Sequence, residues 1–127
     1  MNIPQDLLYT KDHEWVRLNG DVATVGVTDF AQGELGDVVF VQLPDVGKRV
    51  SQGEAFGTIE AVKAVADIYS PVTGSVVEAN TALTERPETM NQDPYGSGWI
   101  VKIKTSNFQG DKGHLLDPAA YADLTSA

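Results

Sequence analysis

The sequence predicts a mostly β domain, a small sandwich or flattened barrel with short helices at its periphery. Short runs rich in valine, isoleucine and aromatic residues recur along the first 104 residues, and turn-forming residues separate most of them. The chain has 127 residues, which suffice to bury one core but not two sizeable ones. We therefore expect a single domain spanning residues 1–127.

Each expected element follows from a local pattern. The Asn19-Gly20-Asp21 turn is typical of a β-hairpin and joins the first two strands. A short helix follows, capped by Thr28 or Asp29. Asp117, with proline next to it, predicts a short C-terminal helix over residues 118–125, and residues 80–96 are expected to be irregular. The expected strands cover residues 13–18, 22–27, 37–43, 56–62, 66–69, 75–79 and 99–104.

Charge and composition exclude several classes of function. Eighteen acidic residues against nine Lys and Arg give a net charge of −9, which repels phosphate backbones and anionic lipids. We therefore expect neither nucleic acid nor a membrane as partner. Cysteine is absent, which excludes disulfides, thiolate metal sites and cysteine nucleophiles. The first residues resemble neither a secretory signal nor a transit peptide, which favours the bacterial cytoplasm over a mature mitochondrial form.

Patterns of catalytic chemistry are missing from the sequence. The two histidines, His13 and His114, lack the spacing of a metal site, and no nucleophile elbow or nucleotide-binding loop occurs. We interpret both histidines as structural. The sequence therefore predicts a non-catalytic protein without catalytic residues or a metal.

One lysine stands out in the segment 57–74. Lys63 is the only basic residue between Arg49 and Arg86, and it lies midway along an expected hairpin within residues 56–70. Small apolar residues frame it, although exposed turns usually carry polar ones. A lysine at a hairpin tip often serves only solubility. The pattern also suits a single amine that a modifying enzyme must recognise, and both interpretations remain open at this point.

Six sequence blocks follow one another along the chain in a distinctive order. They are Tyr9–Val16 (YTKDHEWV), Val22–Gln32 (VATVGVTDFAQ), Leu35–Pro44 (LGDVVFVQLP), Glu60–Ala64 (EAVKA), Asp67–Gly74 (DIYSPVTG) and Asn91–Lys104 (NQDPYGSGWIVKIK). In this order the blocks resemble the glycine cleavage system H proteins, which are lipoyl carriers. The similarity extends from about residue 7 to about residue 124. One departure is Ala61, where the attachment motif of this family usually has serine.

The resemblance implies a barrel-sandwich hybrid fold in which Lys63 carries lipoic acid in amide linkage. It implies a swinging arm that shuttles the aminomethyl intermediate of glycine catabolism and reducing equivalents between enzymes. It further implies that a cleft protects the intermediate from water, with Glu14, Asp67 and Asp12 near the bound ammonium group.

The partners implied by the resemblance are a pyridoxal-phosphate glycine decarboxylase, a tetrahydrofolate-dependent aminomethyltransferase and a dihydrolipoyl dehydrogenase. A lipoylating enzyme must also recognise Lys63. We expect the carrier itself to be a monomer.

Four other interpretations remain open from the sequence. A lipoyl domain of a 2-oxo acid dehydrogenase is usually shorter and precedes Pro/Ala-rich linkers, which are missing here. A biotin carrier normally brackets its lysine with methionines, whereas Val62 and Ala64 flank Lys63. A lipoyl-relay protein, which donates lipoyl groups to other apoproteins, and a plain β domain with an unmodified lysine are the others.

Overall fold

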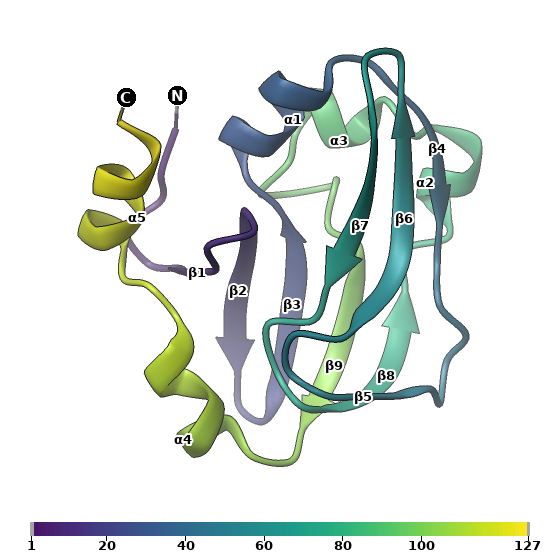
Figure 1. The fold of residues 1–127 in the computed structure, drawn as a ribbon. Helices are drawn as coiled ribbons and strands as arrows, with labels where there is room; N and C mark the ends of the chain where they lie inside the picture. The colour runs from purple at the N-terminus through teal and green to yellow at the C-terminus, as the bar shows by residue number, and fades with distance from the viewer. Residues whose placement is uncertain (1, 127) are drawn as a thin grey trace.

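Two antiparallel sheets form the body of the protein, as the computed structural model of residues 2–126 shows (Figure 1). The six-stranded sheet has the order β1-β2-β3-β9-β8-β5, and the three-stranded sheet has the order β4-β6-β7. Nine strands and short helices confirm the predicted mostly β class within the described residues. The strands are β1 (Leu8–Tyr9), β2 (Glu14–Asn19), β3 (Val22–Val27), β4 (Val38–Gln42), β5 (Arg49–Val50), β6 (Ala55–Ala61), β7 (Val65–Tyr69), β8 (Gly74–Ala79) and β9 (Val101–Thr105).

Alternation of side chains along the strands places the main core between the two sheets. Its buried residues come from both sheets, from α1 and from the segments that follow β8. A second buried cluster joins the two ends of the chain and consists of Leu7, Tyr9, Trp15 and Tyr121. In this cluster the rings of Tyr9 and Tyr121 stack with centroids 4.6 Å apart. The C-terminal helix is therefore attached to the sheet through aromatic contacts.

The helix α1 (Asp29–Leu35) connects the two sheets. Thr28 is the residue that caps it, because its hydroxyl oxygen accepts a hydrogen bond from the Ala31 amide at 3.2 Å. The helix ends at Gly36, whose φ of +77° is left-handed backbone that favours glycine. The chain then enters β4, so α1 lies at one end of the three-stranded sheet (Figure 1).

Residues 80–96, which were expected to be irregular, contain two one-turn helices, and that expectation is wrong. These are α2 (Ala82–Glu85) and α3 (Thr89–Gln92), each of which buries one apolar side chain, Leu83 and Met90 respectively. Prolines and a glycine limit both helices to a single turn, which is too short to show a helical period.

The C-terminal region adds short helices at the edge of the larger sheet that β1 and β2 form (Figure 1). They are α4 (Phe108–Asp111), a 3₁₀ turn (Lys112–His114) and α5 (Pro118–Thr125). Asp117 caps α5 by accepting a hydrogen bond from the Ala120 amide at 2.8 Å. Within residues 2–126, no helix combines the length and apolar character needed to cross a membrane.

Candidate functional site

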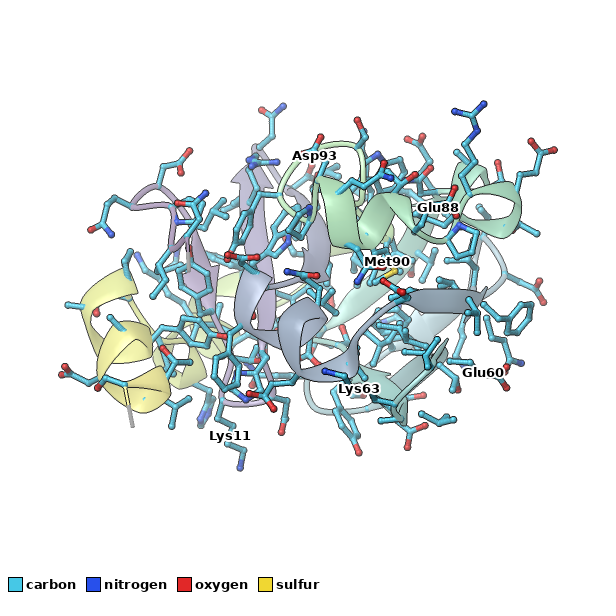
Figure 2. The ribbon with its side chains drawn as sticks, turned by 90° about the horizontal axis from the view of Figure 1, so that it is seen from above. Lys11, Glu60, Lys63, Glu88, Met90 and Asp93 are labelled. Carbon is cyan, nitrogen blue, oxygen red and sulfur yellow. The ribbon has the colours of Figure 1, made fainter. Side chains whose placement is uncertain are left out.

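Lys63 lies in the turn between β6 and β7, where its side chain is exposed. The turn is closed by a hydrogen bond from the Ala61 amide to the Ala64 carbonyl oxygen at 2.9 Å. A second bond of 2.9 Å runs from the Val62 amide to the Asp37 carbonyl oxygen, just beyond the end of α1. The hairpin tip is therefore held against α1, and Figure 2 shows the Lys63 side chain beside that helix.

Two valines at the tip are unusually exposed for apolar residues. Val62 is 71% exposed and Val65 is 66% exposed, so both flank Lys63 without being covered by the protein. Exposed apolar groups are common on protein surfaces singly, but here they surround one accessible amine. The arrangement suits a surface that another protein contacts while it acts on Lys63.

A hollow of about 410 Å³ lies between α1, the β2–β3 hairpin and the β6–β7 hairpin. It brings Asp67 together with Asp12 and Glu14, which are close to each other in the sequence but far from Asp67. The rest of its lining is mostly apolar and comes largely from α1 and the strands: His13, Val27, Phe30, Ala31, Glu34, Leu35, Ile59 and Ala66. A mostly apolar hollow with a few carboxyl groups suits a group with an apolar body and a cationic end.

Glu14 is the buried acid of this hollow, with only 2% of its surface exposed. Its Oε1 accepts a hydrogen bond from the Thr10 hydroxyl at 2.6 Å, and its Oε2 accepts one from the Tyr69 amide at 3.3 Å. Burial raises the pKa of Glu14 to about 8, and these two hydrogen bonds only partly oppose the shift. The carboxyl group is therefore mostly protonated at neutral pH.

His13, which sequence reasoning treated as structural, lines the same hollow. It has a φ of +70°, a rare backbone conformation for a residue other than glycine. Its ring packs 4.6 Å from that of Phe30, and its Nδ1 lies 2.9 Å from the hydroxyl oxygen of Tyr121. Burial lowers the pKa of His13, so the ring is neutral at pH 7. No local pattern in the sequence predicts this contact, because Tyr121 is 108 residues away from His13.

A second hollow of about 390 Å³ lies on the other side of Glu14. It shares Asp12 and Glu14 with the first and extends to Lys11, Tyr69 and His114. Among residues 2–126, no group of three or more His, Asp or Glu side chains could hold a metal ion.

Known proteins of one family match this chain over most of its length. The sequence model described as glycine cleavage H-protein matches residues 7–127. The chain belongs to this family. H proteins are the lipoyl carriers of the glycine cleavage system, and the predicted resemblance is thereby confirmed.

Individual H proteins are similar over nearly the whole chain. The glycine cleavage system H protein of Rubrobacter xylanophilus is 60% identical over 120 residues, which cover 94% of this chain and 92% of the relative. That of Bacteroides fragilis is 53% identical over 127 residues and covers both chains completely. A crystal structure of the H protein from Mycobacterium marinum superposes with a TM-score of 0.87 at 43% identity, and covers 95% of this chain and 97% of that one.

These similarities extend well outside the hairpin that carries Lys63. They include the N-terminal strands and the C-terminal helices of this H protein. The barrel-sandwich fold is confirmed by the structural neighbour. A lipoyl domain of a 2-oxo acid dehydrogenase and a lipoyl-relay protein are not favoured, because the family matched is that of the glycine cleavage system.

Proposed function

We propose that Lys63 is the residue of this H protein that carries lipoic acid, in amide linkage through its Nζ. The observation that carries the proposal is its position at an exposed hairpin tip, beside a hollow that an attached arm could enter. When bound, a lipoyl group supplies two sulfurs that can hold a one-carbon unit and accept two reducing equivalents. The chain contains no cysteine, so its own side chains offer no equivalent pair of sulfurs.

The residues around Lys63 fit such a group. Gly36 leaves room under the lysine stem that a side chain would fill, since a Cβ there would lie 3.2 Å from the Lys63 Cδ. The hollow offers an apolar surface from α1, including Phe30 and Leu35, for the chain and ring of the cofactor. Its mouth is open to solvent at Asp12 and Asp67, both of which are exposed.

Glu14, Asp67 and Asp12 are acidic residues that can supply negative charge to a cationic cargo. We propose that the buried Glu14 carboxyl group gives up its proton when an ammonium group approaches, and then pairs with it as a carboxylate. Such pairing keeps the cargo amine protonated. An ammonium nitrogen has no lone pair with which to expel the sulfur, so the pairing opposes the amine-assisted breakdown that would release ammonia. Asp67 and Asp12 add negative charge at the rim, where solvent weakens each interaction.

The proposed partners follow from the glycine cleavage system. They are a pyridoxal-phosphate glycine decarboxylase, a tetrahydrofolate-dependent aminomethyltransferase, a dihydrolipoyl dehydrogenase and a lipoylating enzyme. A flexible arm on Lys63 raises the local concentration of its reactive end at a docked active site to about millimolar. We propose that the carrier performs none of the chemical steps alone, and that it works with these enzymes in the bacterial cytoplasm.

Mass spectrometry tests the attachment site directly. The protein is expressed with lipoate and a lipoylating enzyme, and its intact mass and peptide map are measured. We expect the mass of one lipoyl group, located on Lys63. The proposal fails if the protein stays unmodified under these conditions or if the group maps to another lysine.

A second experiment tests the hollow. Glu14→Gln and Asp67→Asn are compared with Asp21→Asn, a change at the exposed β2–β3 turn. Each protein is loaded with the aminomethyl cargo, and the release of ammonia is measured without an acceptor enzyme. Glu14→Gln should release ammonia several-fold faster than the wild type, and Asp67→Asn should show a smaller increase in rate. Equal release by all four proteins would remove these residues from the proposed role.

A further inference from the structure

The stem of Lys63 lies against the backbone of Gly36, where a side chain would crowd it. We propose that Gly36, held in place by Asn91, is a positioning residue that sets the direction in which the Lys63 arm leaves the hairpin. The inference rests on the proposed attachment of the lipoyl group to Lys63, and it assigns a role to two residues that lie 27 and 28 positions away in the sequence.

The contact between Gly36 and Lys63 involves three methylene groups. A Cβ at position 36 would lie 3.2 Å from the Lys63 Cγ and Cδ and 3.3 Å from its Cε. Ordinary carbon contacts are about 3.5–4.0 Å, so a side chain at position 36 would push the lysine stem outward by a few tenths of an ångström. The backbone of Gly36, with φ +77° and ψ −159°, also belongs to a region that is essentially restricted to glycine.

Asn91, in helix α3, holds the segment Gly36–Val38 in place; we call this segment the platform. Its Nδ2 donates to the Gly36 carbonyl oxygen at 2.8 Å and to the Gln32 side chain at 3.1 Å, while its Oδ1 accepts from the Val38 amide at 2.9 Å. One side chain thus holds the carbonyl of residue 36 and the amide of residue 38. Between them, the Asp37 carbonyl oxygen accepts the Val62 amide at 2.9 Å, which attaches the hairpin tip to the same segment.

The platform lies at the rim of the hollow. Gly36 directly follows Leu35, and both Glu34 and Leu35 line the hollow that contains Glu14. The atoms that touch Gly36 are methylene carbons, which acylation of Nζ leaves unchanged. The same contact can therefore direct the arm along α1 before and after the cofactor is attached. Figure 2 shows Lys63 beside α1, whereas Lys11, another exposed lysine, extends away from the ribbon.

The wild-type protein without cofactor provides the first test. Carbon-13 relaxation measures the order parameters of the lysine side chains, with Lys11 and Lys112 as exposed controls. We expect the order parameter of the Lys63 Cδ to be about 0.2 higher than that of the Cδ in either control lysine, because contact with Gly36 restricts motion of the Lys63 stem on the nanosecond timescale. A Lys63 stem as mobile as that of Lys11 would overturn the inference, and this measurement does not depend on lipoylation.

Variants provide the second test. Gly36→Ala is matched by Gly47→Ala, which changes a glycine of left-handed φ (+97°) that has nothing within 4 Å of its Cβ position. We expect Gly36→Ala to lower the Lys63 order parameter to that of Lys11. In lipoylated protein it should also raise the rate at which a water-soluble phosphine reduces the dithiolane by about threefold, because the arm spends less time in the hollow. Gly47→Ala should change neither quantity.

Asn91→Ala keeps the inference testable if Gly36→Ala does not fold. This variant removes the three hydrogen bonds of the Asn91 side chain but keeps glycine under Lys63, so we expect a smaller change in the same direction. No change at Lys63 in a folded Gly36→Ala or Asn91→Ala protein would contradict the inference. Mass spectrometry and relaxation test the two proposals separately. Absence of a lipoyl group on Lys63 would refute the proposed attachment site. The relaxation data on protein without cofactor would still test whether Gly36 and Asn91 position the Lys63 stem.

Discussion

The Glu14 carboxyl group accepts a hydrogen bond from the Tyr69 amide across 55 residues of sequence, at 3.3 Å. Glu14 belongs to β2 of the larger sheet, and Tyr69 ends β7 of the smaller one. The contact joins the two sheets between the two hollows, and it buries an acid whose other oxygen binds the Thr10 hydroxyl. A titratable group thus lies where the sheets meet.

Replacing Glu14 by glutamine should make the stability of the protein less sensitive to a rise in pH between the two pKa values of Glu14. In the folded protein the pKa of Glu14 is about 8, against an ordinary value of 4.5, so between these values the folded state holds the extra proton. Raising the pH through this window therefore favours unfolding, by up to about 1.4 kcal/mol per pH unit. Glutamine does not titrate. Urea unfolding of both proteins at pH 5 to 8 should show the wild type losing stability relative to Glu14→Gln, whereas a constant difference would mean that the pKa of Glu14 is not raised.

Removing the Tyr121 hydroxyl should destabilise the protein. This hydroxyl lies 2.9 Å from His13 Nδ1 and 2.6 Å from Thr28 Oγ1, and the Tyr121 side chain is fully buried. We expect Tyr121→Phe to cost about 1–3 kcal/mol of unfolding free energy, because the buried Thr28 hydroxyl and the half-buried His13 ring lose a partner. Tyr69→Phe is the control, since no hydrogen bond of its hydroxyl occurs in the described part of the chain. Equal losses in the two variants would contradict the account.

A methyl group at Gly26 should disrupt the β2–β3 hairpin. Gly26 pairs with Trp15 in register, and a Cβ there would lie 2.6 Å from the indole carbons Cε2 and Cζ2. The ring cannot withdraw easily, because it is fully buried and its Nε1 donates to the Pro94 carbonyl oxygen at 3.0 Å. Gly26→Ala should therefore cost at least about 2 kcal/mol in thermal or urea unfolding.

Gly33→Ala is the matched control for that change. Gly33 is exposed within α1, and nothing lies within 4 Å of its Cβ position. Alanine favours a helix by up to about 1 kcal/mol over glycine, so this variant should be as stable as the wild type or more so. Equal stability of Gly26→Ala and Gly33→Ala would contradict this prediction, because it would mean that the Trp15 ring can move away from a new methyl group at little cost.

Most strands could be predicted from short stretches of sequence, because alternation of apolar residues and turn-forming residues are both visible among residues that are adjacent in the chain. The turn at Gly20 and the cap at Thr28 are examples, and the fold class followed from such features. Strand β1 was missed because two residues show no period. His13 was expected to begin β2, but its left-handed φ delays the strand to Glu14.

The candidate site was only partly predictable. Lys63 stood out because the sequence around it lacks other cations. Glu14, Asp67 and Asp12 came from family resemblance, since nothing local shows that they line one hollow. The support under Lys63 could not be foreseen, because Gly36 and Asn91 meet only through packing of α1 against α3 and the hairpin tip.

Reconstituted glycine cleavage shows whether Lys63 is the residue that carries the cargo. Lys63→Arg and Lys112→Arg are each treated with lipoate and a lipoylating enzyme, and then combined with the decarboxylase, aminomethyltransferase and dihydrolipoyl dehydrogenase. Arginine keeps the charge and cannot form the amide, while Lys112 is an exposed lysine in the C-terminal region. We expect Lys112→Arg to support glycine turnover at the wild-type rate and Lys63→Arg to support none. Full turnover with Lys63→Arg would contradict the assignment of Lys63 as the carrier residue.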